Sequence, residues 1–354
     1  MVKLLSVEML ADLIQKHGFN NFLKDLMTYT KEDFSRWESF DKMPRPASHV
    51  PGGVIELMPI CDDVFYSYKY VNGHPKNPES GKQTVIATGQ LSRVKDGYPL
   101  MISEMTTLTA LRTAATSALA TDLISCPDSQ IIALLGTGAQ SEFQVLAHKM
   151  VRNITTVKFY DVDPKAMDKF EKNMAHSGLE LIRCDDGESA VRDSDIIIVC
   201  TACKNHVDVV KKEWVKAGAH INGLGGDCPG KTELDIKLLP DSKVIVEFFE
   251  QSFIEGEIQR FDHETALNIV HAELWEIVTG KKPARENDQE ITIFDSVGFA
   301  IEDFSVLRLT YELACKYNAG VEHNMVPPIK DPKNLISVLE KSFQKACISE
   351  TLSA

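Results

Sequence analysis

Two glycines directly after an apolar run could hold a nucleotide diphosphate. The run Ile131–Leu135 suits a strand covered on both faces, and after it come Gly136-Thr-Gly138 and a helical pattern. Gly136 permits a tight turn, and Gly138 lets the backbone approach a pyrophosphate at the start of a helix, where free N–H groups bind phosphates. Asp161 follows at the end of the next strand. This context predicts a dinucleotide site, although Ser141 replaces the third small residue of the motif.

The acids after the second strand indicate which nicotinamide dinucleotide fits. Asp161 can accept hydrogen bonds from the ribose hydroxyls, and Asp163 would repel a 2′-phosphate, so NAD is favoured over NADP. Lys158 and Lys165 lie nearby and leave NADP open. Asp161 can also act as a turn former or helix cap before Pro164, and this role can coexist with ribose binding.

Several charged residues lie in β-like or glycine-rich contexts, where a buried site could use them. Lys69 lies between two tyrosines, and Arg112 has Ala and Thr neighbours that let a ligand come close. Asp227 lies in the loop GGDCPGK after a predicted strand, at the kind of edge where doubly wound sheets bind ligands. Taken singly, such residues are more often surface charges. The full set is Arg45, Glu56, Lys69, Arg112, Asp227 and Lys231.

These residues require a scaffold, and the sequence predicts two parts. From residue 131 onward, apolar runs alternate with helical patterns, which indicates an α/β doubly wound parallel sheet. Before it, β-prone runs between residues 54 and 104 predict a small sheet, with helices over residues 1 to about 30 and 107–123. A long helix over 298–317 and a proline-containing tail with a final helix follow. The predicted strands are 131–135, 157–160, 179–184, 195–201, 219–222, 243–248 and 291–294.

We therefore expect a Rossmann-type NAD domain over residues 126–304. A smaller α+β domain would span residues 1–125 and be completed by residues 305–354; the family resemblance described below implies that it is the substrate-binding and dimerisation domain.

Composition narrows the class of function. The net charge of −13 argues against a nucleic-acid binder, and no apolar run is long enough to span a bilayer. Eight cysteines in 354 residues are too few for a disulfide scaffold, which favours reduced cysteines in the cytoplasm. The pair Cys200 and Cys203 forms a C-x-x-C, but no second pair accompanies it, so we expect small buried residues at a strand end and no metal.

Six segments carry a resemblance to a known family. The chain resembles the ornithine cyclodeaminase and μ-crystallin family from end to end, and within it the bacterial ornithine cyclodeaminase branch. The segment at 225–234 is the most discriminating, since other branches share a shorter version of it. The segments are VIELMP (54–59), KYVNGHP (69–75), ALRTAATS (110–117), GTGAQSEFQ (136–144), GGDCPGKTEL (225–234) and FDSVGFAIED (294–303).

The resemblance implies a role for each matching residue. It implies that Arg45, Lys69 and Arg112 bind the carboxylate of an amino acid, while Glu56 and Asp227 face its amines. Asp227, Lys69 and Glu56 are the expected catalytic residues, and Val297 is an expected substrate contact. Expected cofactor contacts, with Gly136 from the motif, are Thr84, Arg112, Thr113, Gly136, Gly138, Ala139, Gln140, Asp161, Thr201, Lys231 and Ser296.

The activity that the resemblance implies is conversion of L-ornithine to L-proline and ammonia, with tightly held NAD as an internal hydride carrier. Alternatives within the family are an alanine dehydrogenase, a ketimine reductase or a lysine cyclodeaminase. A non-catalytic crystallin-like binding protein is the alternative from another class. The family also implies a homodimer formed through the first domain, and no nucleic-acid or membrane partner is expected.

Overall fold

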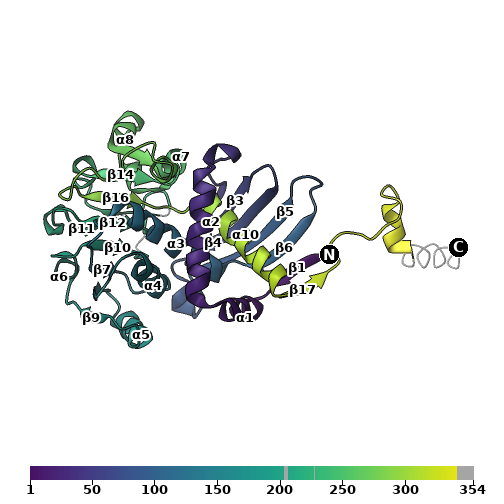
Figure 1. Ribbon diagram of the computed structural model, residues 1–354, viewed down its shortest axis with the longest axis horizontal. Coiled ribbons are helices and arrows are strands. Elements are labelled where there is room, and N and C mark those ends of the chain that lie inside the picture. The colour runs from purple at the N-terminus through teal and green to yellow at the C-terminus, as the bar shows by residue number, and fades with distance from the viewer. Residues whose placement is uncertain (203–205, 227, 341–354) are drawn as a thin grey trace.

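The computed structural model describes residues 1–202, 206–226 and 228–340. Two large sheets form two bodies that lie side by side, and the helix α3 (Thr106–Ile124) lies between them (Figure 1). In the described residues, no helix is both long and apolar enough to cross a membrane.

The first body is built on a seven-stranded sheet of order β17-β1-β6-β5-β4-β3-β2. β1 and β6 pair in parallel, and all other neighbours pair antiparallel. Its outermost strand, β17, comes from the far end of the chain, so both chain ends contribute to this sheet. The strands are β1 (Val2–Leu5), β2 (Ala47–Val50), β3 (Gly53–Cys61), β4 (Phe65–Gly73), β5 (Val85–Arg93), β6 (Pro99–Glu104) and β17 (Val321–His323).

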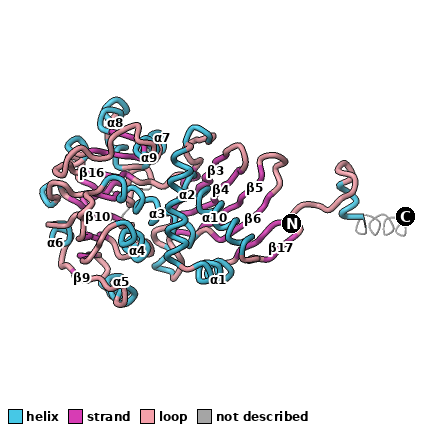
Figure 2. The backbone as a smooth tube through the Cα atoms, viewed as in Figure 1, coloured by secondary structure: helices cyan, strands magenta, loops and turns pink. Residues whose placement is uncertain are grey.

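Among the described residues, helices cover only one face of this sheet. α2 (Phe19–Ser35) and α10 (Ala300–Lys316) lie across it, and Figure 2 shows them over the strands. Side chains alternate along the strands with period two, so Lys69 and Val71 of β4 are buried under the helices while Tyr66 and Tyr70 are exposed. We call the other side the outer face, defined by the exposed side chains of Leu57, Tyr66, Tyr70 and Ile86.

The helix predicted over residues 1 to about 30 is wrong in its continuity. The segment forms β1, then α1 (Val7–His17), and then α2. Gly18 separates the two helices with φ +92°, a left-handed conformation that a helix interior does not adopt. The N–H of Gly18 still donates to the carbonyl of Ile14 and thereby closes α1.

The second body confirms the predicted doubly wound fold. Its eight-stranded sheet has the order β15-β14-β16-β12-β10-β7-β8-β9, and all neighbours pair in parallel. The strands are β7 (Ile131–Leu135), β8 (Thr156–Tyr160), β9 (Glu180–Arg183), β10 (Ile196–Val199), β12 (His220–Gly223), β14 (Lys243–Val246), β15 (Val270–Glu273) and β16 (Thr292–Asp295).

Both faces of this sheet are covered, as the uninterrupted apolar sequence of β7 predicts. Ile132 and Leu134 pack with residues of α4 (Ser141–Val151) and α5 (Pro164–Met174). Ala133 and Leu135 point the other way and pack with residues of α6 (Gly187–Val191). The other helices of this body are α7 (Phe249–Glu255), α8 (His263–Ile269) and α9 (Leu274–Val278). A separate pair of short strands, which the sequence did not predict, consists of β11 (His206–Val210) and β13 (Thr232–Leu234).

The strand order reverses at β7, which has β8 and β9 on one side and β10 on the other. The carboxyl ends of β7 and β10 therefore flank a crevice of the type in which doubly wound sheets bind ligands. α10 runs from this body onto the first sheet, so the domain limit predicted between residues 304 and 305 falls inside one helix.

Candidate active site

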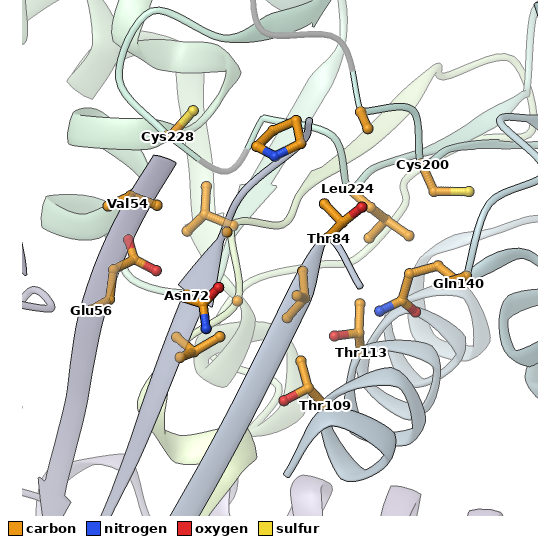
Figure 3. A pocket seen from close by; sticks show the side chains of 18 of the residues that line it. Val54, Glu56, Asn72, Thr84, Thr109, Thr113, Gln140, Cys200, Leu224 and Cys228 are labelled. Carbon is orange, nitrogen blue, oxygen red and sulfur yellow. The ribbon is translucent and has the colours of Figure 1, made fainter. Parts of the chain in front are cut away.

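A cavity of about 310 Å³ lies at the crevice and is lined by both bodies. Figure 3 shows Val54 and Glu56 on one side and Gln140 on the other, with Thr84, Thr109 and Thr113 between them. This volume is in the range of small-molecule sites. The cavity brings together most of the predicted residues, namely Arg45, Glu56, Lys69, Thr84, Arg112, Thr113, Gly138, Ala139, Gln140, Thr201, Lys231, Ser296 and Val297.

Two predicted residues of the described chain are not among those that line the cavity, and a third cannot be placed. Asp227 lies outside the described residues, although its neighbour Cys228 lines the cavity. Gly136 lies behind the wall with φ +93°, and a Cβ there would come within 2.8 Å of the carbonyl oxygen of Cys200. This approach explains why the turn after β7 requires glycine. The other described residue outside the cavity lining is Asp161.

Asp161 braces the glycine turn. One carboxylate oxygen accepts the backbone N–H of Thr137 at 2.6 Å and the Thr137 hydroxyl at 3.1 Å, and the other accepts the N–H of Asp163 at 2.9 Å. The cap of α5 is Asp163, whose side chain accepts the N–H of Lys165. The turn-forming role considered for Asp161 is thus observed, while its contact with a ribose stays a prediction.

The turn itself fits a dinucleotide phosphate. A Cβ on Gly138 would meet nothing within 4 Å, so its backbone faces open space at the start of α4. Ser141, the imperfect position of the motif, is buried and donates its hydroxyl to the carbonyl of Gly138 at 2.7 Å. The buried Oε1 of Gln140 has no hydrogen-bond partner within the described chain. The backbone N–H groups at the start of α4 are hydrogen-bond donors, and Oε1 of Gln140 is an unpaired acceptor. Together they suit a polar ligand that contacts the start of this helix.

Arg45 is held on the substrate side of the cavity. Its Nε lies 3.1 Å from Glu56, its Nη1 donates to the carbonyl of Val297 at 3.2 Å, and Glu255 forms a further ion pair with Nη2. Burial raises the pKa of Glu255 to about 7, against the opposing effect of the Arg45 charge. Arg45 thus links β3 to the loop after β16.

Lys69 and Arg112 share a carboxylate behind the cavity. Lys69 Nζ lies 2.9 Å from Asp303, and Arg112 Nε lies 3.2 Å from the same oxygen, while Arg112 Nη1 donates to Glu302 at 2.5 Å. All four side chains are buried. Burial and the charge of Arg112 together lower the pKa of Lys69 to about 8, against the attraction of Asp303.

The sequence did not predict the buried acids near the cavity, Glu302, Asp303 and Glu247. Glu302 and Asp303 lie in the quoted segment at 294–303, and their signal is two adjacent acids at the start of an apolar helix. Glu247 gave no such signal; it accepts the Ser296 hydroxyl at 2.6 Å and the N–H of Val297 at 2.9 Å. Burial and the neighbouring Glu302 raise the pKa of Glu247 well above its usual value.

Cys200 has a structural contact. Its thiol donates to the carbonyl of Gly136 at 3.2 Å, and burial raises the pKa of this thiol. Cys203, its partner in the C-x-x-C, lies outside the described residues. In the part of the chain that is described, no cluster of three His, Cys, Asp or Glu side chains could hold a metal ion.

The fold and the cavity define the class: a Rossmann-type α/β protein with a second sheet over the carboxyl edge of its parallel strands. The profile of the Ornithine cyclodeaminase/mu-crystallin family matches residues 7–318. The chain belongs to this family, as predicted.

Similar proteins include an ornithine cyclodeaminase of Agrobacterium fabrum. It is 47% identical over 340 residues, covering 96% of this chain and 94% of that protein. A solved archaeal alanine dehydrogenase dimer with bound NAD superposes with a TM-score of 0.85 at 33% identity, covering 92% of this chain and 99% of that one. A lysine cyclodeaminase, whose structures address recognition of L-lysine, L-ornithine and L-2,4-diaminobutyric acid, gives a TM-score of 0.90 at 25% identity, covering 95% and 99%.

Proposed function

We propose that this protein converts L-ornithine to L-proline and ammonia with NAD as an internal hydride carrier. The observation that carries the proposal is one cavity lined by three cations, Arg45, Lys69 and Arg112, whose side chains are at most 6% exposed, beside a glycine turn of dinucleotide type. The ornithine cyclodeaminase of Agrobacterium fabrum, 47% identical over 96% of the chain, supports the same activity.

NAD would be held at the start of α4. Gly138, Ala139 and Gln140 line the cavity there, and Thr113 of α3 and Thr201 after β10 line it from either side. The chemistry that bound NAD would supply is reversible hydride transfer at the α-carbon of the substrate, with no net formation of NADH. Asp161 would bind the adenosine ribose from its position at the end of β8.

The three cations would bind the substrate carboxylate. Arg45 and Arg112 offer planar forks of N–H donors, and Lys69 offers a point charge. Because the pKa of Lys69 is about 8, this side chain remains mostly charged at pH 7. Their fixed positions would orient the α-carbon for hydride transfer.

The acids would handle the amines. We propose that Asp227 accepts a proton from the α-amine and later donates one to the departing amino group, which leaves as ammonia. Glu56, which lines the cavity next to Val54 and Met58 of β3, would attract the δ-amine. By holding this amine near the α-carbon, the cavity would favour closure of the five-membered ring.

The test uses purified protein, L-ornithine and a catalytic amount of NAD, with proline and ammonia measured together. Equal amounts of both, without accumulation of NADH, are the expected result. Stoichiometric NADH from alanine would instead support an alanine dehydrogenase. A preference for L-lysine would make the protein a lysine cyclodeaminase, since one methylene changes selectivity by only about 1–3 kcal/mol. Ketimine reduction would show a reductase, and no turnover of any of these would show a binding protein.

We also propose a cytoplasmic homodimer built on the outer face of the first sheet. The exposed Leu57, Tyr66, Tyr70 and Ile86 on this face, and the archaeal alanine dehydrogenase dimer, support the assembly. A reducing compartment is supported by the free thiols of Cys61, Cys126, Cys184, Cys200 and Cys315.

A further inference from the structure

The segment that carries Arg45 has little local structure to hold it in place. Residues 42–46 form neither helix nor strand, and Arg45 lies between Pro44 and Pro46. Because proline has no backbone N–H, Arg45 supplies the only N–H of this three-residue stretch. The long arginine side chain also has several rotatable bonds that such a loop does not fix. The position of this cation therefore depends on residues from elsewhere in the chain.

Helix α7 of the second body presents two polar side chains to that loop. Gln251 and Glu255 are four positions apart and lie on the same face of the helix. They are 1% and 2% exposed, whereas Ile254 on the same helix is 46% exposed. Figure 1 shows α7 on the side of the second body that faces the first. Buried polar groups require hydrogen-bond partners, so their burial indicates a specific contact.

The contact is a closed ring of hydrogen bonds between Arg45 and α7. Gln251 Oε1 accepts the backbone N–H of Arg45 at 2.7 Å. Gln251 Nε2 donates to Glu255 Oε2 at 2.6 Å, and the same oxygen forms the ion pair with Arg45 Nη2. One helix thus holds both the backbone and the guanidinium of a residue that lies 206 positions before Gln251. Neither Gln251 nor Glu255 lines the cavity, so their contact with the site runs through Arg45.

The other contacts of Arg45 differ from that with Glu255. Nη1 donates to the carbonyls of Val297 at 3.2 Å and Gly298 at 3.3 Å, which fixes the direction of the guanidinium. Glu56, 3.1 Å from Nε, lines the cavity and is exposed to any ligand that enters it. Glu255 is a carboxylate outside the cavity lining. Since the guanidinium has five N–H donors, Glu255 can keep its contact while a ligand carboxylate binds the same group.

We infer that Gln251 and Glu255 are positioning residues, which together hold Arg45 where it binds the carboxylate of the substrate. We call this pair the α7 clamp. The inference rests on the proposed function for the identity of the carboxylate, while the position of Arg45 can be tested without it. The clamp also means that a cation of the first body is set in place by the second, so the substrate site is complete only when the two bodies pack together.

Crystal structures of Glu255→Leu and Gln251→Leu test the positioning without reference to turnover. Leucine keeps much of the side-chain volume and removes the acceptor in each case. We expect the guanidinium of Arg45 to shift by about 1 Å or more, the scale of misplacement that affects a reaction. An unmoved Arg45 in either variant would overturn the role of the residue replaced. If the wild type forms no proline from ornithine, the proposed function fails, and the position of Arg45 still decides the inference.

Kinetic measurements test whether that position matters. Glu255→Leu should lower kcat/KM for L-ornithine about tenfold or more, mainly through KM, because the misplaced cation binds the carboxylate poorly. Glu255→Gln should stay within about threefold of the wild type, since its amide oxygen can accept both hydrogen bonds. The dissociation constant for NAD should stay within about twofold in both variants. A loss in Glu255→Gln as large as in Glu255→Leu would contradict positioning through these hydrogen bonds.

A double-variant cycle with Arg45→Ala separates the clamp from a general effect on the fold. If Glu255 acts through Arg45, adding Glu255→Leu to Arg45→Ala should cause no further loss of kcat/KM. Losses that multiply would show an effect independent of Arg45 and refute the clamp.

Glu273→Leu is the matched control for damage to α7. The Glu273 carboxylate accepts the N–H of Phe249 at the start of α7 at 2.7 Å, and this residue does not line the cavity. The variant should melt at a lower temperature and keep kcat/KM for L-ornithine within about threefold of the wild type. A loss of kcat/KM equal to that of Glu255→Leu would show that any weakening of α7 has the same effect, and the clamp would be refuted.

Discussion

Replacing Asp303 by asparagine should weaken substrate binding by discharging Lys69. Asp303 is fully buried at the start of α10, and one of its oxygens lies 2.9 Å from Lys69 Nζ and 3.2 Å from Arg112 Nε. Its negative charge opposes the burial that lowers the pKa of Lys69 to about 8. The substitution Asp303→Asn would keep the shape of the side chain and remove the charge.

The size of the effect follows from that contact. A hydrogen bond to a charged group contributes about 1.5–3 kcal/mol, and 1.36 kcal/mol corresponds to one pKa unit. Loss of the charge therefore takes the pKa of Lys69 from about 8 to roughly 6–7. At pH 7.5 most Lys69 side chains would then be neutral, and KM for ornithine should rise about tenfold or more. Because one partner of a buried ion pair is lost, the free energy of unfolding should also decrease by about 3–5 kcal/mol.

The assay measures kcat and KM for L-ornithine between pH 6 and 9 in the wild type and in Asp303→Asn. Ionisation of the substrate affects both proteins equally, so the difference between the two profiles reports the enzyme. We expect the rise in KM to begin at a pH one to two units lower in the variant. KM profiles that coincide in the two proteins would refute the reasoning.

Asp33→Asn is the matched control for general destabilisation. Asp33 is also fully buried and also bridges two cations, Arg36 at 2.8 Å and Arg308 at 3.0 Å. It lies on α2 and does not line the cavity. This variant should melt at a lower temperature and keep the wild-type dependence of KM on pH.

Three further predictions concern the glycine turn, the loop acid and a buried carboxyl group. Gly138→Ala should keep the wild-type melting temperature, because the added Cβ meets no protein atom. It should bind NAD at least tenfold more weakly in a titration, because this Cβ enters the space of the ligand. Gly136→Ala should instead lower the melting temperature, because its Cβ collides with Cys200. Asp227→Asn should lower kcat by about 10²–10⁴-fold, and a decrease of only a few-fold would remove its acid–base role. Burial raises the pKa of Asp295 from 3.8 to about 7, so the folded state binds the proton more tightly and the stability from this group is lost as pH rises towards 7. Asp295→Asn should therefore become more stable relative to the wild type between pH 4 and pH 8 by up to about 4 kcal/mol in denaturant titrations, and a constant difference would contradict the assignment.

Local sequence patterns predicted those parts of the site that are formed by residues close together in the chain. The apolar run 131–135, the glycines after it and the helical pattern beyond predicted β7, the turn and α4, because all three depend on neighbouring residues. The same reasoning located α3, which spans Thr106–Ile124 against a prediction of 107–123. The break at Gly18 was missed because the apolar spacing continues across it.

The ion pairs behind the cavity could not be predicted in this way. Lys69 and Asp303 are 234 positions apart, and their contact depends on α10 packing onto the first sheet. Nothing in the vicinity of either residue specifies the other. The pairing of β17 with β1 at the two ends of the chain has the same origin in long-range packing. Such contacts follow from the assembled fold and not from sequence spacing.

The ion pairs of Arg45, Lys69 and Arg112 have a consequence for the entropy of binding. A free Arg or Lys side chain loses up to about 2 kcal/mol of rotamer entropy when it is fixed. Here the carboxylates that pair with each cation already fix it within the fold. The loss of freedom therefore accompanies folding, and an incoming carboxylate meets donors that are already ordered.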